Sequence, residues 1–215
     1  MLPIKLLSMY NIYIISLHES GTGNHLRSAR NILPHTLSCC NQYQWNITLF
    51  NAIDGYRLDE SAWEIYGLNN PQKSKKEKKK FGDLPGAQGC FLSHYILWVR
   101  CVELDQPIII LEDDAEVIAP LRKIDTTFDL LKLHNPRASK QNKLGNWSPG
   151  AFAYWISPLG AKKLVDFSKK NGPNLADKMI ATNILNWEYL MPPIVKLGPR
   201  IGSSTQPEKY PYLKG

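Results

Sequence analysis

Three consecutive acids, Glu112, Asp113 and Asp114, are the residues of this sequence whose types and spacing best suit chemistry. They follow a run of apolar, mostly β-branched residues at positions 108–111, with Pro107 before the run. Such a run is typical of a strand that is covered on both faces in a parallel or mixed sheet. Three adjacent carboxylates repel one another, so a fold that keeps them together is expected to supply a cation or a proton.

The spacing of the acids suits a metal site. If the strand geometry continues past residue 112, Glu112 and Asp114 point to the same side. Carboxylate oxygens at this spacing suit Mn²⁺ or Mg²⁺, which can bridge a diphosphate and offset the charge that develops on a leaving nucleoside diphosphate. The alternative is a solvated acidic turn at a strand end, and the cluster alone does not decide between the two.

Strands and helices alternate in the part of the chain that leads to these acids. Residues 9–17 and 45–50 are predicted strands, and the helix expected between them at 24–38 is interrupted by Pro34. This order predicts a right-handed parallel crossover. A buried helix is expected at 90–104, after a glycine-rich turn, because its apolar residues recur every three or four positions.

The second half of the chain has weaker patterns. Residues 128–133 and 151–156 are predicted strands, and Ser157 with Pro158 predicts the start of a helix over 159–169. A short helix is a candidate at 177–185. The proline-rich end is expected to be mostly extended, with a tail over about 196–215.

Length and composition favour one globular α/β domain over residues 1–215, with 43% hydrophobic and 21% charged residues. No run is as long as a membrane span, and the first residues lack a signal-peptide pattern, so a cytoplasmic protein is expected. Cys39 and Cys40 are adjacent, while Cys90 and Cys101 lie about three helical turns apart. All four are therefore expected to be reduced packing residues.

The net charge of +7 comes mainly from residues 73–80, which begin with Lys73, end with Lys80 and contain six lysines and one glutamate. This segment, within a flexible basic loop predicted at about 69–82, is either a solvated loop or an electrostatic contact for anionic lipid or a phosphorylated acceptor. No aromatic residues alternate with its lysines, which argues against nucleic-acid binding.

Three blocks of the sequence, in order, resemble glycosyltransferase family 25, the lipooligosaccharide-type galactosyltransferases that are related to the collagen galactosyltransferases. The blocks are residues 86–95 with Trp98, residues 110–114, and residues 150–164. Shorter segments at 14–17, 51–55, 192–195 and 203–204 also resemble the family, so the resemblance spans nearly the whole chain.

The resemblance implies a GT-A-like fold, a Rossmann-type mixed sheet flanked by helices, with a UDP-sugar at the carboxyl ends of the strands. It also implies a divalent metal, Mn²⁺ or Mg²⁺, and inversion at the anomeric carbon. On this basis Asp114 is expected to bind the metal directly, Glu112 to flank the metal and ribose, and Asp113 to orient them.

Inverting transfer needs a general base for the acceptor hydroxyl. Asp177 lies where the family carries an Asp after a Pro-Val pair, although Leu175 and Ala176 stand here in place of that pair. Because carboxylates are also stabilised at helix starts, Asp177 is either the base or only a helix cap.

Six further residues are expected around the donor: Ser16, Asp54, Gly55, Gln88, Ser93 and His94. Ser16 and Asp54 lie at the ends of the first two predicted strands and are candidates for uridine and ribose, with strand-end turn geometry as the alternative. His94 could equally be a packed core histidine. The family's Arg pair after the first strand is reduced here to Arg27, with Arg30 one turn later.

The resulting hypothesis is transfer of galactose from UDP-galactose to a terminal sugar of a bacterial lipooligosaccharide or related glycan, near the inner face of the inner membrane. The alternatives are UDP-glucose or a UDP-N-acetylhexosamine as donor, or a relative that binds a sugar nucleotide or glycan without turnover. A nucleic-acid-binding module is the least favoured class.

Overall fold

The computed structural model describes residues 10–19, 23–71, 81, 84–135 and 150–198, and the side chains of residues 23–29 are left out of this description. The basic segment 73–80 and the tail residues 199–215, including Ser203 and Ser204, lie outside the described residues.

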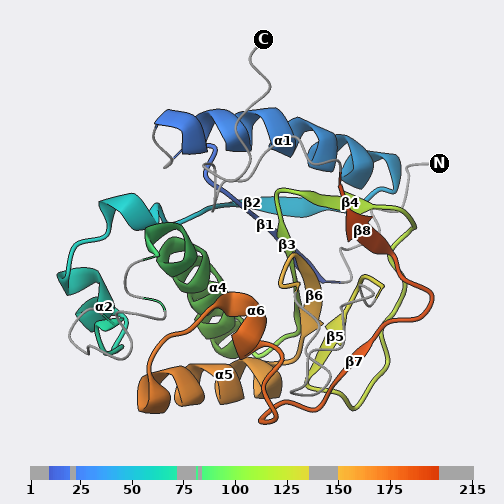
Figure 1. Ribbon diagram of the computed structural model, residues 1–215. Helices are drawn as coiled ribbons and strands as arrows, with labels where there is room; N and C mark the ends of the chain where they lie inside the picture. Colours follow the sequence, from blue (N-terminus) through green and yellow to red (C-terminus); the bar gives the residue numbers. More distant parts are fainter. Residues whose placement is uncertain (1–9, 20–22, 72–80, 82–83, 136–149, 199–215) are drawn as a thin grey trace, which may run out of the picture.

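A six-stranded mixed sheet forms the centre of the molecule, in the order β2-β1-β3-β6-β5-β7 (Figure 1). Its strands are β1 (Asn11–Ser16), β2 (Ile47–Asn51), β3 (Ile108–Glu112), β5 (Leu130–Lys132), β6 (Ala153–Ile156) and β7 (Trp187–Tyr189). The predicted α/β fold with a helix-flanked mixed sheet is confirmed.

Strand directions gather the site residues at one edge of the sheet. β1 is parallel to both β2 and β3, whereas β6 is antiparallel to β3 and β5. The carboxyl ends of β1, β2 and β3 therefore meet. Residues 108–111 of β3 are fully buried, as their apolar run predicted.

Helix α1 (Gly23–Gln42) covers one face of the sheet and connects β1 to β2 (Figure 1). The prediction that Pro34 interrupts this helix is wrong, because the helix continues through it. Pro34 is exposed, so the carbonyl that loses its hydrogen bond lies on the solvent side, while buried Ile32, Leu33 and Thr36 hold the helix on the sheet.

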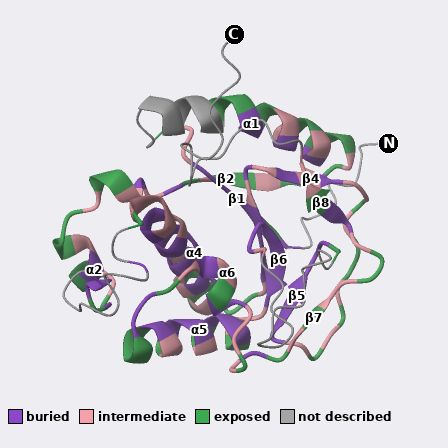
Figure 2. Ribbon diagram, in the orientation of Figure 1, coloured by how far each residue is buried: buried purple, intermediate pink, exposed green. Residues whose placement is uncertain are grey.

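Helices α4 (Pro85–Leu104), α5 (Pro158–Asn171) and α6 (Ala176–Met179) cover the opposite face (Figures 1 and 2). The sheet thus separates two apolar cores. α4 starts five residues earlier than predicted, with Pro85 in its first turn, where the missing N–H costs nothing. Ser157 caps α5 as predicted, accepting a hydrogen bond from Gly160 N at 3.0 Å.

Three short strands were not predicted: β7, β4 (Ala115–Val117) and β8 (Val195–Leu197). β4 and β8 pair antiparallel in a separate two-stranded sheet beside α1. The expected extended end of the chain thus includes a paired strand before residue 199. Two small helices, η1 (Gly55–Arg57) and α2 (Ser61–Ile65), follow β2.

All four cysteines are free, as predicted. Among the described helices, none combines the length and the apolar character that crossing a bilayer would require.

Candidate functional site

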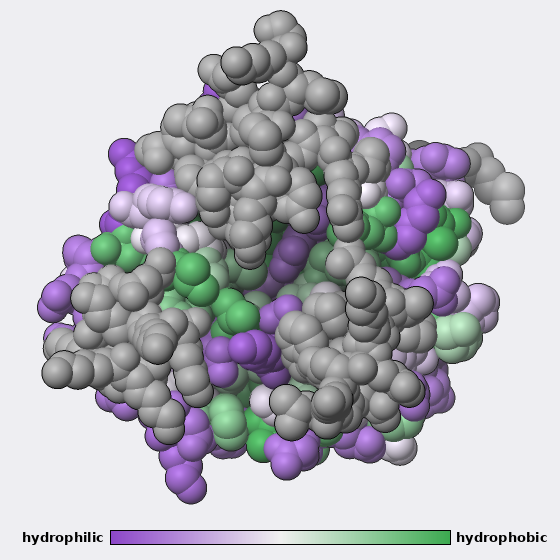
Figure 3. Space-filling model, viewed as in Figure 1, coloured by the Kyte–Doolittle hydropathy of each residue, from purple (hydrophilic) through white to green (hydrophobic). Residues whose placement is uncertain are grey.

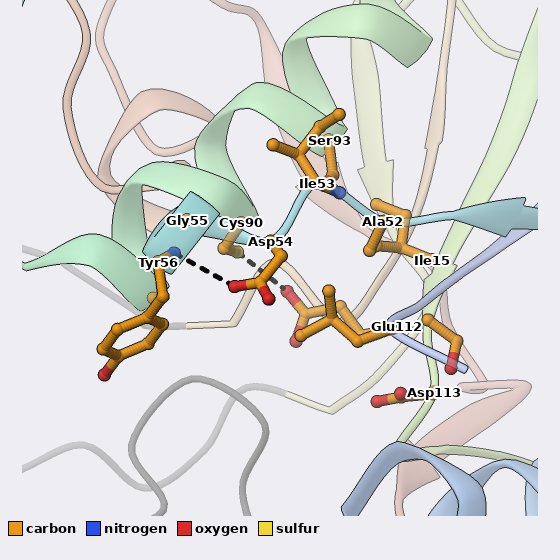
Figure 4. A pocket seen from close by; sticks show the side chains of 13 residues that line it. Ile15, Ala52, Ile53, Asp54, Gly55, Tyr56, Cys90, Ser93, Glu112 and Asp113 are labelled. Atoms are coloured by element: carbon orange, nitrogen blue, oxygen red, sulfur yellow. Dashed lines mark hydrogen bonds between the residues drawn. The ribbon is translucent and has the colours of Figure 1, made fainter. Parts of the chain in front are cut away.

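A pocket of about 480 Å³, counting space open to solvent, lies at the joined carboxyl ends of β1, β2 and β3. Its lining comes from these strand ends, the β2–η1 loop and the start of α4, and includes Ser16, Asp54, Gly55, Ser93, Glu112 and Asp113. Figure 4 shows the carboxyl groups of Asp54, Glu112 and Asp113 around the same opening. On the viewed face of the molecule, both hydrophilic and hydrophobic side chains are visible in a central hollow (Figure 3).

Two glycines let the β2–η1 loop lie directly against α4. A Cβ at Gly55 would stand 1.7 Å from the Pro85 carbonyl oxygen, and one at Gly89 would stand 2.3 Å from the Ile53 carbonyl oxygen. Both contacts are with backbone, so no side-chain rotation could relieve them. Gly55, predicted to contact the donor, therefore also shapes the pocket wall.

Ser93 fastens this loop to the helix. Its buried hydroxyl accepts a hydrogen bond from Ile53 N at 2.9 Å and donates one to Gly89 O at 2.8 Å. Ser93 lines the pocket, but its polar atom is occupied by these two backbone groups. Asp54 similarly accepts from Tyr56 N at 3.0 Å and caps η1.

Ser93→Ala should therefore destabilise the protein by about 1–3 kcal/mol, because the Ile53 N–H loses its partner inside the protein. Urea unfolding measures this change. Ser168→Ala is a matched control, since the buried Ser168 hydroxyl donates only to Leu164 O within its own helix. Equal losses in the two variants would contradict the fastening role of Ser93.

The acidic triplet does not stay in strand geometry. β3 ends at Glu112, and Asp113 and Asp114 form the turn before β4, so the alternation that would align Glu112 with Asp114 does not extend to Asp114. The turn is held by the Thr36 hydroxyl, which donates to Asp113 O at 2.5 Å, and by Gly198 N, which donates to Asp114 O at 2.8 Å.

Asp113 is the buried acid of the triplet, with 5% of its surface exposed. The pKa of its carboxyl is raised to about 7, mainly by burial; the nearby Ser16 hydroxyl acts to lower this pKa and the Glu112 charge acts to raise it. Among the described residues, neither Asp113 Oδ2 nor the Ser16 hydroxyl has a hydrogen-bond partner. The pocket therefore contains an acid oxygen that a cation or a ligand donor could satisfy.

Glu112 is held by a chain of hydrogen bonds from the core. Trp98 Nε1 donates to the Tyr154 hydroxyl oxygen at 2.8 Å, which lies 2.8 Å from His94 Nδ1, and His94 Nε2 lies 3.2 Å from Glu112 Oε1. Because an ionised Glu112 only accepts, a neutral His94 would donate to it from Nε2 and accept from Tyr154 at Nδ1. Burial raises the pKa of Tyr154, which keeps this hydroxyl protonated.

His94 is accordingly a fully buried residue that positions Glu112, and the described residues lining the pocket include neither His94 nor Gln88. Gln88 is buried, and its side-chain amide donates to Phe81 O at 3.3 Å. The sequence did not indicate the roles of Trp98 and Tyr154 in this hydrogen-bond chain. It also did not indicate the contacts of the Ser93 hydroxyl with the backbone. Asp114 is also absent from the pocket lining.

Asp177 lies in α6, which contacts α4. Leu175 occupies the N-cap position of α6, so Asp177 is not its N-cap. Burial raises the pKa of the Asp177 carboxyl; the Glu112 charge raises it further, whereas the Lys178 N–H and the charges of Lys178 and Lys132 lower it. The fold thus brings Asp177 within electrostatic reach of Glu112.

Lys132, in β5, is a buried cation that the sequence did not single out. Burial lowers its pKa to about 8, and the Asp177 charge partly offsets this shift. Its Nζ lies 4.5 Å from the centre of the Trp187 ring, a favourable cation–π contact. Lys132 therefore sets part of the electrostatic environment of Asp177.

A divalent cation would be compatible with the donor groups in this pocket. Glu112 and Asp113 offer carboxylate oxygens, which hard ions such as Mg²⁺ and Mn²⁺ prefer. The unpartnered Oδ2 of Asp113 and its raised pKa are features that a bound cation would relieve.

A comparison with protein families matches residues 9–133, more than half of the chain, to the model described as glycosyltransferase family 25 (LPS biosynthesis protein). The matched range contains β1 to β5, α4 and the acidic turn. Asp177 and the segments at 150–164 and 192–204 lie beyond it.

Curated relatives carry the same family description. The chain is 28% identical over 145 residues to a glycosyltransferase 25 family member of Aedes aegypti, and 29% identical over 140 residues to one of Anopheles gambiae. These matches cover 56% and 54% of this chain, but only 23% of the length of each relative.

Solved structures with a similar chain path include a glycosyltransferase involved in glycosylation of the major capsid of PBCV-1, at 9% identity and a TM-score of 0.43. The match covers 85% of this chain and 82% of that one. Another is the apo form of the glycosyltransferase GlyE of Streptococcus pneumoniae TIGR4, at 14% identity and a TM-score of 0.41, covering 83% and 45% of the two chains.

Proposed function

This chain belongs to glycosyltransferase family 25, and we propose that it transfers a hexose from a UDP-sugar to a hydroxyl group of a glycan. The observation that supports this most is the pocket at the carboxyl ends of β1, β2 and β3, with Glu112 and the partly unsatisfied Asp113 in its wall. Ligands of open α/β sheets bind at such strand ends.

Glu112 and Asp113 are the proposed oxygen ligands for Mn²⁺ or Mg²⁺, and Asp114, which the sequence favoured for the direct bond, is the alternative ligand. When bound, the ion would offset the negative charge on the leaving diphosphate. The chain from Trp98 through Tyr154 and His94 keeps the Glu112 carboxylate in place. Ser16, Asp54 and Gly55 are proposed to contact the nucleoside.

Asp177 is the proposed general base. In an inverting transfer, the acceptor oxygen forms a bond to the anomeric carbon while the bond from that carbon to UDP breaks. Asp177 takes the proton of the acceptor hydroxyl, and its raised pKa makes it a stronger base than an exposed aspartate.

Galactose is the proposed sugar, and a terminal sugar of a lipooligosaccharide or related glycan is the proposed acceptor. The family's description as an LPS biosynthesis protein supports this acceptor class. UDP-glucose and UDP-N-acetylhexosamines are the alternative donors, because small differences in pocket shape separate these sugars.

UDP release from a panel of UDP-sugars tests the proposal. With Mn²⁺ present, we expect UDP-galactose to be consumed fastest, and we expect EDTA to remove most of the activity. Absence of UDP release from every donor would contradict the proposed activity, while release unaffected by EDTA would contradict only the role of the metal.

Residues 73–80 are proposed to hold the protein at an anionic membrane surface, as a peripheral contact. Replacing the six lysines of this segment with glutamine should weaken binding to phosphatidylserine vesicles by about 1 kcal/mol per lysine near the surface. Vesicle cosedimentation measures this, with neutral phosphatidylcholine vesicles as the control. Unchanged binding to the anionic vesicles would make the segment a solvated loop.

A further inference from the structure

A second cluster of potential metal ligands lies between α1 and β4. It consists of His35 and Cys39, one helical turn apart on the same face of α1, and Glu116 of β4. Their potential ligand atoms all lie within 4.8 Å of one another. None of the three lines the pocket described above.

The distances between the potential ligand atoms of this cluster are close to the ligand-to-ligand distances in a tetrahedral zinc site. With ordinary Zn–N, Zn–O and Zn–S bonds, tetrahedral geometry places N and O about 3.4 Å apart and S and N about 3.6 Å apart. His35 Nε2 lies 3.3 Å from Glu116 Oε2, and Cys39 Sγ lies 3.8 Å from His35 Nε2. The three groups therefore need little movement to bind one ion.

The geometry points to a binding site for Zn²⁺, or a similar borderline transition metal, formed by His35, Cys39 and Glu116. One imidazole, one thiolate and one carboxylate suit such an ion, and Mg²⁺ or Ca²⁺ would instead favour oxygen ligands alone. Three protein ligands leave the fourth position for water or an added ligand.

The Glu116 carboxylate has one oxygen placed to bind a metal ion together with His35. Its Oε1 lies 2.8 Å from Lys196 Nζ of β8, whereas Oε2 faces His35. Lys196 can thus orient the carboxylate while the second oxygen binds the ion. His35 and Glu116 are both partly exposed, with 38% and 20% of their side chains accessible, so an ion from solution can reach them.

An ion at this site would stabilise the structure next to the acidic turn at Asp113 and Asp114. Thr36, next to His35, donates to the Asp113 carbonyl, and Glu116 follows Asp114 by two residues. An ion bound by α1 and β4 would therefore link the helix that donates to the turn with the strand that follows the turn. This inference does not depend on the proposed transferase activity.

Co²⁺ titration of the full chain tests the metal site of His35, Cys39 and Glu116, since cobalt bound to a thiolate gives a charge-transfer band in the near ultraviolet. We expect the band in the wild type and in Cys90→Ser, and its loss in Cys39→Ser. Cys90→Ser is the informative comparison because Cys90, His94 and Glu112 form another possible ligand group, near the pocket. Glu116→Gln should weaken Zn²⁺ binding at least about tenfold in competition with Co²⁺.

Thermal unfolding gives a second readout. Zn²⁺ should raise the melting temperature of the wild type and of Cys90→Ser, but not that of Cys39→Ser. Circular dichroism without metal establishes that each variant is folded. Absence of the band in the wild type, or a band that Cys90→Ser removes and Cys39→Ser keeps, would overturn the assignment, leaving only a polar contact between His35 and Glu116.

Discussion

Asp177→Asn should lower the rate of sugar transfer about 10²- to 10⁴-fold, the usual contribution of a positioned general base. The substitution keeps the size of the side chain but removes its ability to accept the acceptor proton. Donor affinity should stay close to that of the wild type, because the pocket at the ends of β1, β2 and β3 does not include Asp177. Steady-state transfer rates and calorimetric UDP-sugar binding measure the two effects separately.

The pH profile gives a sharper check on this role. Burial and the Glu112 charge raise the pKa of Asp177, and only the deprotonated form can act as a base. The transfer rate of the wild type should therefore rise with pH through this raised pKa, and Asp177→Asn should lose that rise.

Asp166→Asn is the matched control, since Asp166 is an exposed α5 residue paired with Lys162, and it should transfer at the wild-type rate. If Asp177→Asn kept both the rate and the pH profile, Asp177 would have only a structural role in α6.

The sequence predicted the part of the fold that strong local patterns determine. The apolar run before Glu112 became the fully buried β3, and Ser157 with Pro158 marked the start of α5. The residues of β4, β7 and β8 were missed because each strand has three residues, too few for a clear alternation, whereas the equally short β5 was marked by the mostly apolar stretch 128–133 around it. Their pairing depends on contacts with distant parts of the chain.

Within the site, the structure places Glu112 and Asp113 at the pocket but leaves Gln88, His94 and Asp114 outside its lining, and the sequence did not indicate what each polar atom does. Ser93 and His94 belong to the same helix, yet Ser93 binds the β2–η1 loop and His94 connects Tyr154 to Glu112. Tyr154 is sixty positions away from His94, so no local spacing could have shown this contact. The alternation expected for the triplet failed because the chain turns immediately after Glu112.

Asp113→Asn should abolish metal-dependent donor binding. In the absence of metal, it should also make the protein more stable than the wild type at pH 8. In the wild type, burial raises the Asp113 pKa from 3.8 to about 7. A shift of about three pKa units corresponds to a cost on the order of 4 kcal/mol for keeping the ionised group in the fold. Asparagine fills the same space and carries no charge.

The sign of the pH dependence follows from the two ionisation states. Below about pH 4 the carboxyl is protonated in both the folded and the unfolded chain, so it makes no difference to stability. Between about pH 4 and pH 7 mainly the unfolded chain ionises, and the wild type loses stability progressively. Above about pH 7 both states are ionised and the cost stays constant. The advantage of Asp113→Asn should therefore appear above about pH 4 and level off near pH 7.

Urea unfolding in EDTA between pH 4 and pH 8 measures this advantage, and repeating it with Mn²⁺ tests the role of Asp113 as a ligand. A bound ion stabilises the folded state alone, so Mn²⁺ should stabilise the wild type at pH 8 and have little effect on Asp113→Asn. Asp114→Asn distinguishes the two candidate ligands. If Asp114→Asn loses the response to Mn²⁺ while Asp113→Asn keeps it, the direct metal bond belongs to Asp114, and the buried Asp113 carboxyl serves to shape the turn.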